Sequence, residues 1–216
     1  MWKSQAMAES FAGRRQRRVV DTAPNPIPKY KVLLVGGASV GKTSIFRRLL
    51  HTGGDFGELS PPGTVGVNIG VKCVDVEGLG PMVVELWDVP SIAAPDKSCQ
   101  NELYFDNTHG ILFVHSAVNR GSFQHLQAYH TAFTLHSTSM PVAMLVLKNK
   151  SDDTIDETAS IHLQWLETQK IDQVNVSAKM NVGLLACLRR LLGEIATSNQ
   201  PPNNANSDCQ VLQAKS

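Results

Sequence analysis

The chain has 216 residues, of which 42% are hydrophobic, so it is long enough for one domain with a substantial core and two tails. Its net charge of +1 argues against a general nucleic-acid coat protein. No apolar run approaches the roughly 18 residues of a membrane span, and no apolar signal-type segment follows the N-terminal charges. The four cysteines show no CxxC spacing and indicate reduced thiols rather than a disulfide or zinc framework. We therefore expect a cytoplasmic protein with no nucleic-acid partner.

Both ends of the chain are predicted to lie outside the folded domain. Residues 1–28 are predicted to form a disordered extension that contains the basic cluster Arg14–Arg18 and the proline-rich segment Pro24–Pro28. A solvated arm is the favoured interpretation, and a weak site for acidic surfaces or an import-type sequence is the alternative. Residues 198–216 are polar and contain too little apolar area to fold alone. The folded domain is therefore predicted at residues 29–197.

Strands and helices alternate through this domain, which predicts an α/β fold with a mostly parallel sheet and helices on both faces. The predicted strands are Lys31–Val35, Gly66–Val76, Met82–Trp87, Ile111–His115, Val142–Leu147 and Gln173–Val176. The predicted helices are Lys42–Leu50, Gly121–His136, Asp156–Gln169 and Val182–Ala196, and a further helix between Pro95 and Tyr104 is left open. The short link Glu77–Pro81 indicates a hairpin, so one strand pair is expected to be antiparallel.

The segment Gly36–Thr43 matches the phosphate-binding pattern G-x-x-x-x-G-K-[ST] and lies between a strand and a helix, as that pattern requires. Glycines let the backbone wrap a phosphate, and the following helix contributes its positive N-terminal end. Lys42 is predicted to reach the β- and γ-phosphates, and the Thr43 hydroxyl to ligate Mg²⁺. The predicted phosphate-binding residues are Ala38, Ser39, Val40, Gly41, Lys42, Thr43 and Ser44.

A second element selects the base. Asn149-Lys150-Ser151-Asp152 follows a buried strand and has the N-K-x-D pattern of guanine-nucleotide proteins. A carboxylate at Asp152 can accept from both N1–H and the exocyclic amine of guanine, whereas adenine would leave it unpaired. Asn149 would brace neighbouring loops and Lys150 would pack along the base. Further along, Ser177-Ala178-Lys179 would offer the Ala178 N–H to guanine O6 and cover the base with Lys179. GTP or GDP is the predicted ligand.

These motifs resemble the Ras superfamily of small GTPases, and within it the Rab branch. The resemblance covers about Lys29 to Ala196 and is carried further by Thr64-Val65-Gly66-Val67, Glu85-Leu86-Trp87-Asp88 and Tyr104–Gly110. The atypical, non-prenylated Rab-like-three group is more similar still, because it shares the wording Thr-Val-Gly and Glu-Leu-Trp-Asp-Val. The resemblance implies a P-loop small-GTPase fold with a six-stranded sheet.

The resemblance also implies roles and partners. Thr43 and Thr64 would ligate Mg²⁺, Asp88 would hold it through water, and Thr64 would report the γ-phosphate. Loss of that phosphate would release the loop around Thr64, an order–disorder switch. Effector and regulatory proteins are the implied partners, a homodimer is left open, and association with membranes would be transient and through partners.

Two departures from the family pattern restrain these expectations. Where the family has Asp-x-x-Gly-Gln, this chain has Asp88-Val89-Pro90-Ser91-Ile92. Ile92 cannot orient the attacking water as glutamine does, and Pro90 and Ser91 stiffen the hinge. Lys42, Thr64 and Ser91 are the residues left for catalysis, and slow hydrolysis is expected. Cys209 is followed by seven residues, so no prenylation box and no lipid anchor are predicted.

Three functions compete on these residues. The first is a regulatory GTPase with slow turnover, and the second is a GTP-binding interaction module with negligible turnover. A third, an ATP-dependent kinase or ATPase, is disfavoured by Asp152.

Overall fold

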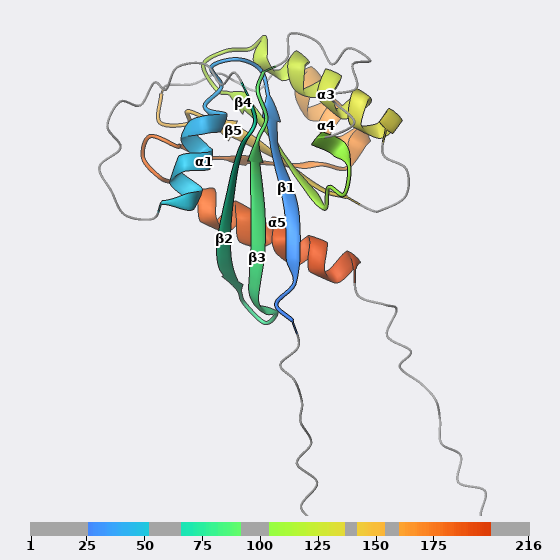
Figure 1. Cartoon of the computed structure of the whole chain (residues 1–216). Helices are drawn as coiled ribbons and strands as arrows, with labels where there is room; N and C mark the ends of the chain where they lie inside the picture. Colours follow the sequence, from blue (N-terminus) through green and yellow to red (C-terminus); the bar gives the residue numbers. More distant parts are fainter. Residues whose placement is uncertain (1–25, 52–65, 92–103, 137–141, 154–159, 200–216) are drawn as a thin grey trace, which may run out of the picture.

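The alternating apolar segments form one sheet of six strands in the order β2-β3-β1-β4-β5-β6 (Figure 1). This is a computed structural model, and it describes residues 26–51, 66–91, 104–136, 142–153 and 160–199. The strands are β1 (Lys29–Gly36), β2 (Asn68–Val76), β3 (Gly80–Asp88), β4 (Gly110–Ser116), β5 (Ala143–Asn149) and β6 (Asp172–Asn175). The helices are α1 (Lys42–Leu50), α3 (Ser122–His136), α4 (Ser160–Gln169) and α5 (Leu184–Ser198).

The strand pairing is parallel except at one edge of the sheet. β1 lies between β3 and β4 and pairs in parallel with both, and β5 and β6 continue the parallel order. β2 pairs antiparallel with β3 across the hairpin, in which Gly78 and Gly80 adopt the positive φ angles that favour glycine. The predicted six-stranded fold with one antiparallel strand is confirmed.

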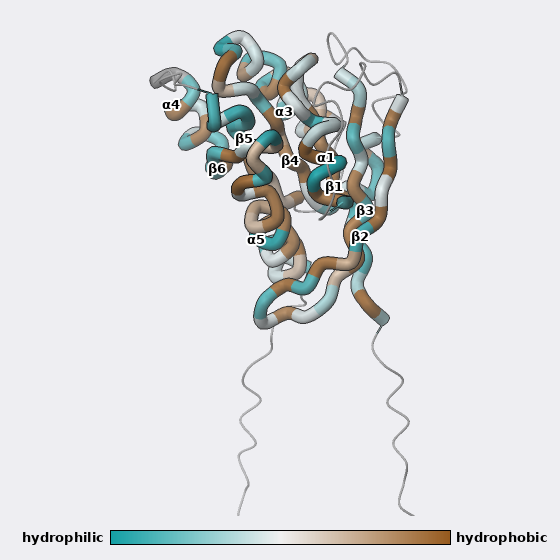
Figure 2. Tube along the Cα trace, turned by 90° about the vertical axis from the view of Figure 1, so that its left-hand side faces the viewer, coloured by the Kyte–Doolittle hydropathy of each residue, from teal (hydrophilic) through white to brown (hydrophobic). Residues whose placement is uncertain are grey.

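The core is divided between the two faces of the sheet because side chains alternate along each strand. Val32 and Leu34 of β1 join a cluster with α1 and α5, whereas Leu33 and Val35 join a cluster with α3 and α4. Hydrophobic segments accordingly run through β4, which is buried along its whole length, and along one side of α5 (Figure 2). The predicted arrangement of helices on both faces is therefore confirmed.

Several boundaries differ from the sequence predictions. β5 extends to Asn149, so this residue ends the strand instead of following it. β2 begins at Asn68, two positions after the predicted Gly66. The predicted start of the fourth helix at Asp156 lies outside the described residues, and so does the segment 95–103, although Tyr104 is helical. No helix among the described ranges is both long and apolar enough to cross a membrane.

Candidate functional site

The predicted site residues come together at the edge of the sheet where the parallel strands end. β1, β3, β4 and β5 all run in the same direction, so the segments that follow them meet at their carboxyl ends. The segment after β1 is the phosphate-binding loop, the segment after β3 contains Ser91, and the segment after β5 contains Asp152. Residues that are far apart in sequence are thereby placed around one edge.

The phosphate-binding loop has a backbone that side chains would obstruct. Gly36 has a φ of 154°, and a Cβ there would lie 2.1 Å from the carbonyl oxygen of Val114. Gly41 has a φ of 98°, and a Cβ there would lie 2.3 Å from Asn149 Nδ2. Ser39 also has a positive φ, of 57°. Alternating backbone conformations of this kind turn successive N–H groups into a concavity that suits an anion.

α1 adds its own donors to the loop. The helix starts after Gly41, which provides no side-chain cap, and its first turn has no acidic residue. The first N–H groups of a helix have no intrahelical acceptor, so they can bind a phosphate. Ala38 and Ser39 are exposed, and Val40 is buried in the core.

The Lys42 side chain is buried over the loop, with 6% of its surface exposed. Its Nζ donates to the carbonyl oxygens of Gly36 (2.9 Å) and Gly37 (2.8 Å) and to Ser91 Oγ (2.6 Å). Burial lowers the pKa of this ammonium to about 8, and the nearby Asp88 partly opposes that effect. A buried cation is therefore aimed at the place where the motif requires a phosphate.

Asp88 ends β3 as a fully buried carboxylate. Thr43 Oγ1 donates to its Oδ2 at 2.7 Å, and Asn68 Nδ2 donates to the same oxygen at 3.1 Å. Its Oδ1 has no hydrogen-bond partner among the described residues. Because a buried, unpaired carboxylate oxygen is costly, this atom indicates a missing cation or donor. The Thr43 hydroxyl and the Asp88 carboxylate form an oxygen donor set that fits Mg²⁺.

Asn149 joins the two halves of the site and is 1% exposed. Its Nδ2 donates to the carbonyl oxygen of Val40 in the phosphate-binding loop at 2.8 Å. Its Oδ1 accepts from the backbone N–H of Ala178 at 3.0 Å. The predicted bond from this N–H to guanine O6 therefore requires the amide to share or exchange its acceptor.

The carboxylate of Asp152 is held by Ser177–Lys179, the segment after β6 that we call the base-side loop. Ser177 Oγ donates to Asp152 Oδ1 at 2.5 Å, and Lys179 Nζ lies 3.6 Å from Asp152 Oδ2. The Ser177 hydrogen bond is the main cause that lowers the pKa of Asp152, with Lys179 adding to it. Lys150, which lies between Asn149 and Asp152 in the sequence, adopts a positive φ of 66°. Asp152 is thus held as an anionic acceptor near Ala178 and Lys179.

Two of the predicted residues lie outside the described chain, namely Thr64 and Ile92. The structure brings Lys42, Thr43 and Asp88 together around the predicted phosphate site, and it brings Asn149, Asp152 and the segment 177–179 together around the predicted base site. Ser91 is exposed but reaches Lys42.

Asn68 and Arg48 were missed by the sequence analysis. Asn68 is opposite Asp88 in the β2–β3 register, which its amide hydrogen bond then uses. Arg48 donates to the carbonyl oxygens of Ala178 (2.9 Å) and Lys179 (3.0 Å) and so fixes the base-side loop to α1. No local motif includes either residue. The expected hairpin could have pointed to Asn68, and the two arginines in the last turn of α1 could have pointed to Arg48.

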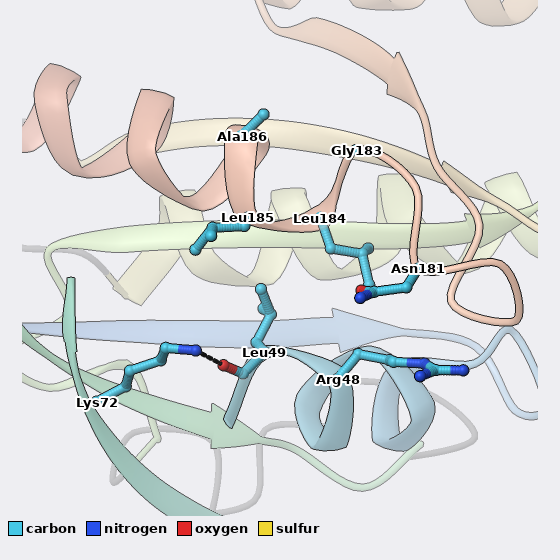
Figure 3. Close-up of a pocket in the computed structure, with 8 residues that line it drawn as sticks. All are labelled: Arg48, Leu49, Lys72, Asn181, Gly183, Leu184, Leu185 and Ala186. Atoms are coloured by element: carbon cyan, nitrogen blue, oxygen red, sulfur yellow. Dashed lines mark hydrogen bonds between the residues drawn. The ribbon is translucent and has the colours of Figure 1, made fainter. Parts of the chain in front are cut away.

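Arg48 also lines a hollow of about 290 Å³ between α1, β2 and the start of α5 (Figure 3). The other cation there, Lys72, donates to the carbonyl oxygen of Leu49 at 2.5 Å. Both side chains thus bind backbone carbonyls at the end of α1 and in the base-side loop. The hollow belongs to the packing that positions the site.

Comparison with known proteins shows the family to which the chain belongs. Residues 31–197 match the model of the Ras family. The chain belongs to the Ras family. It is similar to mouse Ras-related protein Rab-42, with 26% identity over 157 residues that cover 68% of this chain and 72% of the relative. It is also similar to mouse Rab-33A, with 27% identity over 152 residues that cover 69% of this chain and 62% of the relative.

Human Rab-like protein 3 is a further relative, with 28% identity over 162 residues that cover 72% of this chain and 66% of that protein. The chain therefore covers between 62% and 72% of the length of these three relatives. The expected membership in the Ras superfamily, Rab branch, is confirmed, and a protein of the Rab-like-three type is among the relatives. The Ras-family chain is a Rab-like small GTPase by descent.

Proposed function

We propose that this Rab-like chain binds GTP and GDP with Mg²⁺ and acts as a molecular switch in the cytoplasm. The observation that carries the proposal is the position of Asn149. One buried amide binds both the phosphate-binding loop, at Val40, and the base-side loop, at Ala178. A nucleotide that spans these loops would contact a phosphate site and a guanine-selective carboxylate that are already held together.

The base preference rests on Asp152. Its carboxylate is kept anionic by Ser177 and Lys179, so it can accept two hydrogen bonds from the guanine edge. Adenine offers neither donor, and the cost of an unpaired carboxylate would exclude it. GTP and GDP are therefore proposed over ATP and ADP.

The metal would lie at Thr43 and Asp88, where the unpaired Asp88 Oδ1 lacks a partner among the described atoms. Mg²⁺ bound with the nucleotide would neutralise phosphate charge. Thr64 would complete this side in the GTP form, and the chain around it would order with the γ-phosphate. Effectors and regulators would read that change, and transient membrane association would come through such partners.

Hydrolysis would be slow in this chain. Lys42, Thr64 and the backbone N–H of Ser91 remain to contact the phosphates of GTP, but Ile92 offers no hydrogen bond to a water molecule. The second candidate, a GTP-binding interaction module with negligible turnover, is favoured by the same residue. We therefore expect Ile92 to slow the hydrolysis of GTP without preventing nucleotide binding.

A single-turnover assay with radiolabelled GTP and Mg²⁺ separates the two candidates. Slow release of phosphate above the uncatalysed rate, abolished by removal of Mg²⁺, is expected for the switch. A rate equal to that without protein, in a chain shown to bind GTP, would leave only the interaction module. Lys42→Ala serves as the binding control, since it removes the phosphate-side cation. GTP affinity that is unchanged in this variant would contradict the whole proposal.

A further inference from the structure

The Lys42 ammonium has no spare donor in this structure. An ammonium carries three N–H donors, and Lys42 Nζ makes three hydrogen bonds, to Gly36 O, Gly37 O and Ser91 Oγ. To bind a phosphate oxygen, Lys42 must give up at least one of them. The bond that is given up identifies the acceptor in the protein that competes with the phosphates for Lys42.

The two carbonyl bonds belong to the loop itself. Gly36 and Gly37 lie six and five residues before Lys42, respectively, and the bonds to their carbonyl oxygens fold the side chain back over the loop that must receive the phosphates. Gly37 is buried, so loss of its bond to Lys42 would weaken the pairing of a carbonyl that water does not readily reach. The bonds to the loop are therefore the ones that a bound nucleotide can retain.

The third bond comes from a different segment. Ser91 is 49 positions away, and its Oγ is the shortest contact of Lys42, at 2.6 Å. The segment before it is held on the sheet, because the Val89 N–H donates to the carbonyl oxygen of Leu34 at 3.2 Å. The ring of Pro90 fixes the φ angle of Pro90 itself, and the carbonyl oxygen of Pro90 accepts a hydrogen bond from the Tyr129 hydroxyl at 3.5 Å. The hydroxyl of Ser91 is thus presented to Lys42 as a neutral acceptor.

We propose that Ser91 is a positioning residue that holds Lys42 in the nucleotide-free protein and competes with the phosphates of GTP and GDP for this ammonium. The inference rests on the proposed nucleotide binding and adds a control on affinity and release. The family pattern has glycine at this position, which has no hydroxyl to offer. In this chain, the hydroxyl replaces a phosphate oxygen when the site is empty and is displaced when the site fills.

The test compares binding of fluorescent GDP to the nucleotide-stripped full chain and to three variants at position 91. Ser91→Ala and Ser91→Gly should bind GDP about ten-fold more tightly, which corresponds to about 1.4 kcal/mol, because the empty state loses its hydrogen bond to a charged group. Ser91→Thr keeps a hydroxyl and should remain near the unmodified protein. Ser198→Ala, at the exposed end of α5, is the control for loss of a hydroxyl far from the site.

Urea unfolding provides a second readout. Ser91→Ala should unfold at lower urea than the unmodified chain when both are free of nucleotide, and at the same urea when both are saturated with GDP. GDP affinity in Ser91→Ala that is equal to or weaker than that of the unmodified chain would overturn the competition.

The failure of nucleotide binding itself gives a different pattern. If the unmodified chain bound no guanine nucleotide, the proposed function would fall. The nucleotide-free unfolding comparison would still test Lys42 and Ser91, since equal stability of the two proteins would show that the hydrogen bond does not stabilise the empty site.

Discussion

Replacement of Asn149 by alanine tests the central bridge of the site. The change removes the donor to Val40 O (2.8 Å) and the acceptor of the Ala178 N–H (3.0 Å). Both backbone groups lie at residues that are 4% exposed or less, so water does not readily replace the amide. Each unpaired buried group costs about 1–3 kcal/mol, so the free energy of unfolding should fall by about 2–6 kcal/mol.

The measurement is urea unfolding of the full chain at several GDP concentrations, extrapolated to zero GDP. The extrapolation separates the intrinsic loss from the stabilisation that bound ligand adds by mass action. Asn175→Ala is the matched control, because Asn175 is exposed at the end of β6 and should change the stability by less than about 0.5 kcal/mol. Release of fluorescent GDP should also become at least about ten-fold faster in Asn149→Ala, since both loops lose a support. A stability loss below about 1 kcal/mol would refute the role of Asn149 as a bridge.

Three further changes follow from the contacts. Asp152→Asn should lower the affinity for GTP and raise the affinity for xanthosine triphosphate, so that the ratio of the two affinities shifts by about ten-fold or more in competition binding. An unchanged ratio would contradict guanine selection by this carboxylate. Asn68→Ala removes a hydrogen bond to Asp88 and should lower the affinity for Mg²⁺ about ten-fold, measured as the Mg²⁺ concentration that slows GDP release. An unaltered Mg²⁺ dependence would show that Asn68 does not orient the carboxylate. Burial lowers the pKa of His115 to about 4, partly opposed by its bond to Gln173, so the imidazole is neutral in the fold. Stability should therefore decrease as the pH falls from about 6.5 to about 4, by up to about 3 kcal/mol in urea unfolding, and a His115→Gln variant with the same pH slope would refute this assignment.

The two nucleotide-binding motifs could be predicted because the residues of each are close together in the sequence. The pattern of the predicted phosphate-binding loop depends on glycines and a lysine within a few positions. The mostly parallel sheet could be predicted because helices alternate with strands along the chain. The two-residue delay at the start of β2 and the inclusion of Asn149 in β5 depend on pairing with neighbours, which no single segment encodes.

The missed residues depend on tertiary contacts. Asn68 reaches Asp88 only because the hairpin register places the two opposite each other. Arg48 reaches the carbonyls of Ala178 and Lys179 across 130 and 131 positions. Ser91 was expected to stiffen the hinge after Asp88, and the hydrogen bond of its hydroxyl to Lys42 depends on the three-dimensional arrangement.

The register of the hairpin has a consequence for the surface of the sheet. Asn68 and Asp88 pair at one end of β2, and a slip by one residue would exchange the faces of every side chain along the strand. Ile69 and Val71, which are 49% and 59% exposed, would then turn to the opposite face. The pairing of Asn68 with Asp88 therefore helps to fix which side chains β2 displays to solvent.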